Sequence, residues 1–180
     1  MPPVPRWRPT ARLLLVDPSD RVLLFRFANQ DGGATWITPG GGVHRGETVT
    51  AAAVRELAEE TGHVLSEAAL GPVVATRAGL WRSETSGRLH FGADTFFLVR
   101  VGHSEISTDG HEEYERLAIT EHRWWSAEEL RSTSEQVSPP GIGDLVASLL
   151  ANGGPARPAR LRWREAPWGS LPSEGRPPGG

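Results

Sequence analysis

Three glutamates crowd into one turn of a predicted helix. Glu56, Glu59 and Glu60 lie within the eight residues RELAEETG, which begin at position 55. Like-charged side chains at these spacings weaken an isolated helix, so the turn is either solvated or neutralised by a cation. Mg²⁺ prefers oxygen ligands and usually keeps water and substrate phosphate oxygens, so three carboxylates would supply half of its site. The chemistry that this pattern favours is attack of a metal-activated water at phosphorus.

A helix over residues 48–61 must position these carboxylates. The segment is rich in alanine, and Gly62 stands where a left-handed C-terminal cap is expected. At about 100° per residue, the three glutamates fall on one side of the helix. The residues expected on the packed side are Thr50, Val54, Leu57, Ala58 and Thr61. One face therefore packs on the protein while another presents carboxylates.

A short strand at 36–38 leads into this helix through Pro39 and three glycines, residues 40–42. Glycine permits close approach of the backbone and leaves room for phosphate groups. Arg55 carries a planar guanidinium that suits the holding of a carboxylate. An acidic helix face on its own is usually just solvated, but the spacing to Gly41, Glu47 and Arg55 favours a metal site.

The rest of the sequence predicts an alternation of strands and helices. Strands are expected at 11–16 and 22–27, paired as a hairpin, at 72–80 and 90–101, and at 119–125. A capping box at 126–129 starts a short helix, and 142–151 form a final amphipathic helix. Trp36 is expected in the core, and Trp124 and Trp125 on opposite sides of their strand.

Both ends differ from this pattern. Residues 1–9, rich in Pro and Arg, are expected to form an extended arm. Residues 152–180 hold six Gly, six Pro and five Arg and are expected to be a mostly unstructured tail, although 161–163 could pair as an edge strand. Trp163 and Trp168 would dock on the domain or on a second subunit. The predicted organisation is one domain, residues 1–151, followed by the tail at 152–180.

Composition excludes several classes of function. The chain has 180 residues, 38% of them hydrophobic, which suits one domain with a sizeable core. It contains no cysteine, and all 19 basic residues are arginine, so thiolate metal sites and Schiff-base or P-loop lysines are excluded. The net charge of −3 gives no global basic field for nucleic acid. Because no apolar run approaches the length of a membrane span, we expect a cytoplasmic protein.

The full spacing resembles the Nudix box, the signature of the Nudix hydrolase family. From Gly41 it runs through five residues to Glu47, seven to Arg55-Glu56-Leu57, one to Glu59-Glu60 and one to Gly62. The resemblance covers roughly residues 10–150. It departs at His63, where the family prefers a bulky aliphatic residue, and Val64 is expected to supply that packing.

The resemblance implies an α/β fold with a mixed β-sheet sandwiched between α-helices (α/β/α). It implies hydrolysis of a diphosphate linkage in a nucleoside diphosphate joined to another moiety, with Mg²⁺ or Mn²⁺. The implied metal ligands are Glu56, Glu59 and Glu60. Glu59 and Glu60 would be the main ligands, and the base would be Glu56 in preference to Glu60, with Glu56 otherwise a further ligand. Arg55 would orient the glutamates, and Glu47 would pair with Arg55. Gly41 and Gly62 would shape the loops at the two ends of the helix.

The family often recruits one more acid from a later loop. The candidates are Glu112, Glu113, Glu115 and Glu121, among which the sequence does not choose. Taken by itself, the acidic segment holding the first three favours a solvated loop.

Three other functions are compatible with parts of the sequence. A catalytically inactive ligand sensor would have no need for the whole glutamate cluster. An isoprenoid diphosphate isomerase usually involves a cysteine, which this chain lacks. An RNA-directed enzyme is disfavoured because there is no extended basic surface. The sequence leaves open which diphosphate is the substrate and whether the protein is a homodimer.

Overall fold

The computed structural model describes residues 4–29, 31–82 and 87–163. Within them, one mixed sheet has the strand order β7-β3-β2-β1-β5-β4-β8. The remaining strand, β6, lies off this path and pairs with β2. The strands are β1 (Arg6–Val16), β2 (Val22–Ala28), β3 (Ala34–Ile37), β4 (Val73–Arg82), β5 (Leu89–Arg100), β6 (Ile119–Trp125), β7 (Val137–Ser138) and β8 (Ala159–Arg160). The helices are α1 (Val49–Thr61), α2 (Glu113–Ala118), α3 (Ala127–Ser132) and α4 (Ile142–Asn152), with a 3₁₀ turn η1 (Glu67–Ala69).

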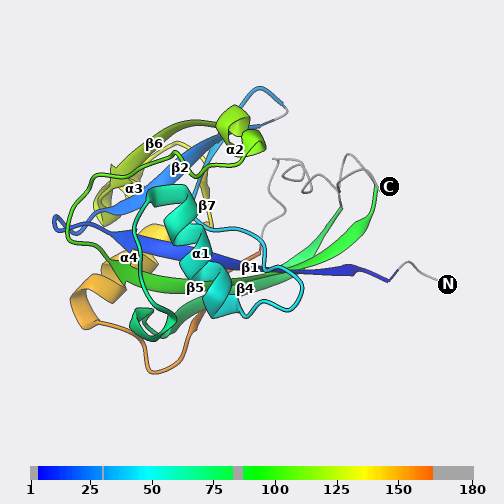
Figure 1. The fold of residues 1–180 in the computed structure, drawn as a ribbon. Helices are drawn as coiled ribbons and strands as arrows, with labels where there is room; N and C mark the ends of the chain where they lie inside the picture. The colour runs from blue at the N-terminus through cyan, green and yellow to red at the C-terminus, as the bar shows by residue number, and fades with distance from the viewer. Residues whose placement is uncertain (1–3, 30, 83–86, 164–180) are drawn as a thin grey trace.

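Alternation along β1 divides the interior into two cores. Leu13 and Leu15 pack with Leu57 of α1 on one face of the sheet. Leu14 packs on the opposite face with Leu130 of α3 and with residues of α4. Successive side chains of a strand point to opposite faces, so a strand that is apolar at every position is covered by helices on both sides. This arrangement confirms the predicted α/β/α fold, and Figure 1 shows α1 crossing β1.

The tryptophans of the central strands follow the same alternation. Trp36 and Trp125 are buried in the core beside α3 and α4, where their rings pack edge to face with 5.1 Å between the ring centroids. Trp124 points to the other face and donates its indole N–H to the carbonyl oxygen of Ser104 at 2.9 Å. The structure thus confirms core packing for Trp36 and opposite faces for the adjacent pair.

Strand β1 differs from its prediction in length and in partner. It pairs in parallel with β5 along its whole length, from Arg6 opposite His90 to Val16 opposite Arg100. The antiparallel hairpin to β2 is limited to the pair Val16 and Val22. Residues 6–9 of the expected extended arm thus form the first part of strand β1. An extended Pro/Arg-rich segment satisfies its backbone polar groups once a long neighbouring strand lies beside it.

The segment after α4 packs on the sheet. Strand β8 pairs in parallel with β4, and the Leu161 N–H donates to the Thr76 carbonyl at 2.8 Å. The edge strand therefore begins two residues before the predicted 161–163. The Trp163 indole donates to the Leu80 carbonyl at 3.2 Å, and the Arg77 guanidinium lies 5.3 Å from its ring. Trp163 docks on the domain, as expected, whereas Trp168 lies outside the described residues.

Two glycines make the surface on which Trp163 lies. A Cβ at Gly79 or at Gly92 would overlap the indole, so the ring depends on bare backbone at neighbouring positions of β4 and β5. We expect Gly92→Ala to lower the free energy of unfolding by about 1–3 kcal/mol through overpacking. Urea denaturation measures this loss.

The matched control is the same substitution in a Trp163→Ala background. There the added methyl meets no indole, and alanine is the better strand residue, so Gly92→Ala should cost nothing or stabilise slightly. An equal cost in both backgrounds would contradict the packing of Trp163 on Gly92.

Candidate active site

Helix α1 begins and ends close to the predicted residues. Thr48 caps its N-terminus by accepting the Ala51 N–H at 3.0 Å, and Gly62 ends it at φ 74°. Leu57 and Thr61 are buried as predicted, and Ala52 and Ala53 are buried with them. This packing brings Glu56 and Glu60, which lie one turn apart, into the protein rather than out into water.

The chain beyond the cap corrects one expectation. Val64 is 81% exposed and does not take the place of the aliphatic residue that the Nudix pattern prefers after Gly62. Leu65 packs against the α1 core instead. The imidazole at the departing position, His63, lies 4.7 Å from the ring of His103. The left-handed cap turns the chain so that the second residue beyond it points outward and the third inward.

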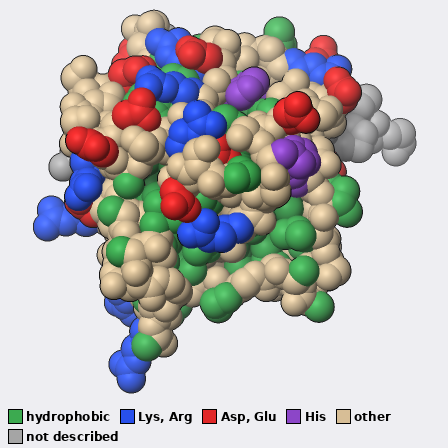
Figure 2. Space-filling model, turned by 90° about the vertical axis from the view of Figure 1, so that its left-hand side faces the viewer, with side chains coloured by type: hydrophobic (Ala, Val, Ile, Leu, Met, Phe, Trp, Pro, Cys, Tyr) green, Lys and Arg blue, Asp and Glu red, His purple; other side chains and the backbone are tan. Residues whose placement is uncertain are grey.

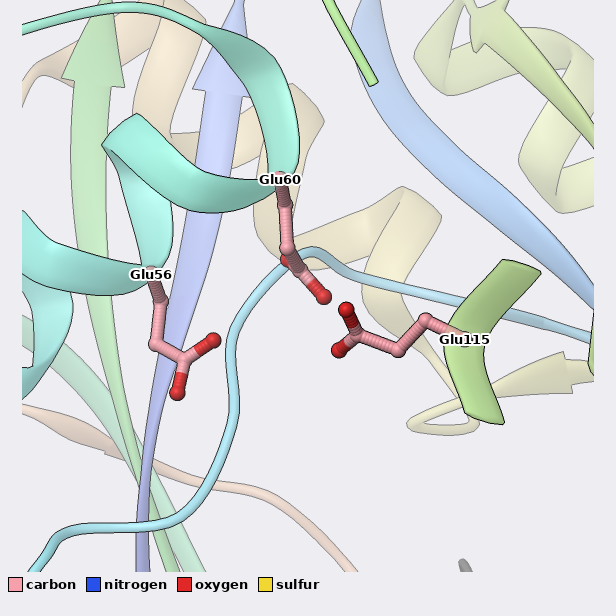
Figure 3. Close-up of side chains that lie close together, drawn as sticks. All are labelled: Glu56, Glu60 and Glu115. Carbon is pink, nitrogen blue, oxygen red and sulfur yellow. The ribbon is translucent and has the colours of Figure 1, made fainter. Parts of the chain in front are cut away.

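Three buried carboxylates meet beside α1. One oxygen each from Glu56, Glu60 and Glu115 lies within 4.8 Å of the other two, and the residues are 6%, 2% and 6% exposed. Figure 3 shows Glu60 of α1 and Glu115 of α2 reaching toward each other, with Glu56 one turn away on the same helix. Burying several like charges is costly unless a cation or protons neutralise them. An all-oxygen set of this kind fits a hard divalent cation such as Mg²⁺ or Mn²⁺.

Glu59 lies outside this group. Its side chain is 43% exposed, and its carboxylate accepts a hydrogen bond from Arg55 at 3.0 Å. At 100° per residue, Glu56 and Glu60 stand only about 40° apart around the helix, whereas Glu59 is about 100° from Glu60. The expected set on one helical turn is therefore divided: two members enter the buried group, and Glu59 lies beside Arg55.

Arg55 joins the box residues by several hydrogen bonds. Its guanidinium holds Glu47 through two bonds of 2.9 and 3.1 Å, and it also donates to Glu56 at 2.7 Å and to the Gly42 carbonyl at 2.9 Å. The hydrogen bonds that Arg55 donates to Glu47 lower the pKa of Glu47, and the same bonds, together with the charge of Glu56, raise the pKa of Arg55. Arg55 therefore stays charged and holds one oxygen of Glu56, which leaves the other oxygen for the buried group.

The glycine turn before α1 contacts two of the carboxylates. The Gly40 N–H donates to Glu60 at 2.5 Å. Gly40 has φ 121°, and a side chain there would overlap the backbone of Ala11. A Cβ on Gly41 would lie 2.5 Å from a carboxylate oxygen of Glu56. The space left by the predicted supporting residue Gly41 thus accommodates a protein carboxylate.

The third carboxylate is positioned by contacts between two distant segments. Residues before α2 are fixed to the end of α1, because the Ser107 N–H donates to the Thr61 carbonyl at 3.0 Å and His111 Nε2 lies 3.0 Å from the Glu60 carbonyl. Glu115 then accepts the Glu112 N–H at 2.8 Å and the Tyr114 hydroxyl at 3.1 Å. These bonds orient its carboxylate toward α1.

Among the four candidate acids, the structure brings only one to the site. Glu112, Glu113 and Glu121 are exposed, whereas Glu115 is buried. The prediction of a solvated loop was wrong for Glu115, because the segment folds into α2 and the residues just before it are hydrogen-bonded to the end of α1. Sequence reasoning also missed Tyr114 and His111. The sequence does not choose among the three nearly adjacent acids; the contacts of residues 107–111 with α1 and the hydrogen bond from the Glu112 N–H to Glu115 do so.

Burial and repulsion between neighbouring carboxylates raise the pKa values of Glu56 and Glu60. Burial raises the pKa of Glu60 well above its usual range, and the neighbouring charges of Glu56 and Glu115 raise it further. Burial also raises the pKa of Glu56, although the Arg55 charge opposes this. Without a cation, protons therefore remain on the group at pH values where ordinary carboxyl groups are ionised.

This shift predicts a pH dependence for the metal-free protein. Because its folded pKa is raised, Glu60 keeps a proton that the unfolded chain releases above about pH 4.5. The associated stability is full below that pH and is lost as pH rises through the folded pKa. Glu60→Gln does not titrate, so its stability relative to wild type should increase with pH, by at most about 1.4 kcal/mol per pH unit for one proton.

Urea unfolding in EDTA between pH 5 and pH 8 measures this difference. Titrating groups outside the buried group are common to both proteins and cancel in the comparison. The exposed Glu113→Gln serves as the control and should track the wild type. A stability difference between Glu60→Gln and wild type that stays constant over this range would contradict the assignment.

Comparison with known proteins identifies the family. The model of the NUDIX domain matches residues 6–144. The chain belongs to the NUDIX family. It is 30% identical to Nudix hydrolase 25 of Arabidopsis thaliana over 160 residues, which cover 81% of this chain and 87% of that protein. Against an RNA pyrophosphohydrolase of Caulobacter vibrioides it is 47% identical over 58 residues, 32% of this chain and 34% of that protein. The chain thus spans about a third of the length of the RNA pyrophosphohydrolases that it matches.

Solved structures of other NUDIX proteins share the fold. A MutT protein from Methanosarcina mazei Go1 matches with a TM-score of 0.58 and 18% identity, over 82% of this chain and 95% of that one. The NUDIX domain of Shewanella oneidensis NrtR, solved with ADP ribose, matches with a TM-score of 0.58 and 15% identity, over 82% of this chain and 89% of that one. At these identities the likeness concerns the fold alone.

Each helix in the part of the chain that the structure describes is too short or too polar to cross a membrane.

Proposed function

We propose that this NUDIX protein is a pyrophosphohydrolase that uses Mg²⁺ or Mn²⁺ to hydrolyse a diphosphate linkage in a nucleoside diphosphate joined to another group. The observation that carries the proposal is the buried group of Glu56, Glu60 and Glu115, whose ligand oxygens lie within 4.8 Å of one another. Three carboxylates that are almost fully buried repel one another, and a multivalent cation would neutralise them. A cation there would neutralise the substrate's diphosphate and activate water for attack at phosphorus.

The protein's own groups would hold and orient that centre. Glu56, Glu60 and Glu115 would be the ligands, and Arg55 would fix Glu56 through the 2.7 Å hydrogen bond. The general base would be Glu56 or Glu60, the two carboxylates for which the resemblance to the Nudix box implies this role. Glu59 as a ligand stays a prediction, and its half-exposed carboxylate lies on the solvent side of Arg55.

Charge and surface favour a small nucleotide as the substrate. The net charge is −3, so the chain has no overall basic field for a polyanion, and on the face in Figure 2 acidic and basic side chains lie interspersed. A protein that relied on many phosphate contacts typically carries an overall basic charge. The names of the matched proteins, an RNA pyrophosphohydrolase and a domain with bound ADP ribose, both concern a diphosphate next to a nucleoside. We take that shared unit as the substrate class.

The test is hydrolysis of a substrate panel with Mg²⁺, with Mn²⁺ and with EDTA. The panel holds ADP-ribose, nucleotide sugars, dinucleoside polyphosphates, nucleoside triphosphates and 5′-triphosphate RNA, and the readout is release of phosphate or nucleoside monophosphate. We expect metal-dependent turnover of at least one nucleotide. Glu60→Gln and Glu115→Gln should each lower kcat/KM by roughly 100-fold or more, because each removes a charged ligand.

Glu113→Gln is the matched control on α2 and should stay within about twofold of wild type. Glutamine at 115 can still accept the Glu112 N–H, so α2 keeps its N-terminal hydrogen bond. Unchanged turnover in both ligand variants would count against the assignment. Binding of a panel member without turnover of any would instead favour a ligand-binding regulator.

A further inference from the structure

The glycine turn that contacts Glu60 is held from its other side by a buried arginine of β1. Arg12 is 5% exposed, and its Nη1 donates to the Gly40 carbonyl at 2.7 Å and to the Thr38 carbonyl at 3.3 Å. One guanidinium nitrogen thus bridges two carbonyls that stand two residues apart. This is a specific contact with the backbone, and its charge-assisted bonds are among the stronger hydrogen bonds in proteins.

The two carbonyls flank the peptide unit that reaches the carboxylate. The peptide between Pro39 and Gly40 donates its N–H to Glu60 at 2.5 Å, while its carbonyl accepts the Leu13 N–H at 2.9 Å. Arg12 holds the carbonyl of the preceding peptide and that of the following one. Contacts from β1 therefore hold this peptide and both of its neighbours, and together they fix the direction in which the Gly40 N–H points.

Gly40 itself depends on this support. Its φ of 121° is a conformation that other residues rarely adopt, and it lies so close to β1 that a Cβ would overlap the Ala11 backbone. A glycine has the most backbone freedom to lose, so its conformation needs external contacts to stay in place. Arg12 supplies this contact on the β1 side through the Thr38 and Gly40 carbonyls, while Arg55 of α1 donates to the Gly42 carbonyl.

We propose that Arg12 is a positioning residue for the metal centre: by bridging the Thr38 and Gly40 carbonyls, it directs the Gly40 N–H at Glu60 and holds that carboxylate ready for the cation. The inference rests on the proposed function, since it takes Glu60 as a metal ligand. Outer groups that orient a ligand commonly change metal affinity or activity by 10- to 100-fold when they are removed.

Arg77 offers a matched comparison for a merely structural role. It is a buried arginine of the same sheet, 7% exposed, on strand β4. Its guanidinium donates hydrogen bonds to the Asp94 carboxylate at 2.5 Å and to the Ser138 hydroxyl at 3.0 Å, and not to the glycine turn. Replacing either arginine by glutamine removes a buried cation and should lower stability, but only the change at Arg12 should affect the metal.

The experiment measures Mn²⁺ binding to the substrate-free protein by electron paramagnetic resonance or calorimetry, beside thermal unfolding. We expect Arg12→Gln to weaken Mn²⁺ binding about tenfold or more, and Arg77→Gln to leave it within about twofold of wild type. Arg12→Lys keeps the charge and one donor nitrogen on a more flexible chain, so it should bind Mn²⁺ more tightly than Arg12→Gln and about threefold more weakly than wild type.

Three outcomes would overturn the inference. In the first, Arg12→Gln is destabilised as much as Arg77→Gln but binds Mn²⁺ with wild-type affinity. The second is an equal loss of Mn²⁺ affinity in both glutamine variants. The third is a wild type that binds no Mn²⁺, which overturns the proposed function as well. If Arg12→Gln does not fold, Arg12→Lys is compared with Arg77→Lys, and equal Mn²⁺ affinities overturn the inference.

The two proposals fail separately. A wild type that binds Mn²⁺ in an Arg12-dependent manner but hydrolyses no panel substrate overturns the proposed function and supports the role of Arg12. A wild type that hydrolyses a substrate with unchanged Mn²⁺ affinity in Arg12→Gln overturns the role of Arg12 alone.

Discussion

The repulsion among three buried carboxylates is the constraint on which the rest of this site depends. Glu56, Glu60 and Glu115 are almost without solvent, and each has an oxygen within 4.8 Å of the others. The surrounding groups offset part of this charge: Arg55 donates to Glu56, and the Gly40 N–H donates to Glu60. The remaining negative charge requires protons or a cation, and the same desolvation that raises the pKa values makes a cation more effective there.

The scaffold brings the three carboxylates together through long-range contacts. Strand β1 runs beneath α1 and packs Leu13 and Leu15 against it, which sets where Glu56 and Glu60 lie. The same strand holds the glycine turn through backbone bonds to Pro39 and Gly41. Residues 107–111 attach α2 to the end of α1, and α2 delivers Glu115. The site thus forms only when the sheet, α1 and α2 are assembled together.

The local features of this fold could be predicted from the sequence because each has a local cause. Helix α1 has an apolar side, a threonine cap and a terminal glycine, and the bond between Arg55 and Glu47 follows from the spacing of a recognisable motif. Strands rich in apolar and aromatic residues were also predictable, and so was the capping box of α3, in which Ser126 and Glu129 bond reciprocally.

The features that the sequence did not reveal depend on partners far along the chain. Parallel pairing of β1 with β5 extends the strand to Arg6, although the Pro/Arg composition favoured an arm. Glu115 differs from Glu113 only in the tertiary contacts of the helix that carries both. The separation of Glu59 from the buried group reflects which side of α1 faces the protein. The strand pairing of β1 and the burial of Glu115 have no signal within a window of a few residues, whereas the i,i+4 spacing of Glu56 and Glu60 already sets them apart from Glu59.

The most direct measurement is the anomalous diffraction of crystals grown with Mn²⁺, since it locates the ion and its protein ligands at once. The account predicts an ion bound by carboxylate oxygens of Glu56, Glu60 and Glu115, with Arg55 still hydrogen-bonded to Glu47. An ion held by Glu59 while Glu115 points away, or full Mn²⁺ occupancy elsewhere on the protein, would contradict it.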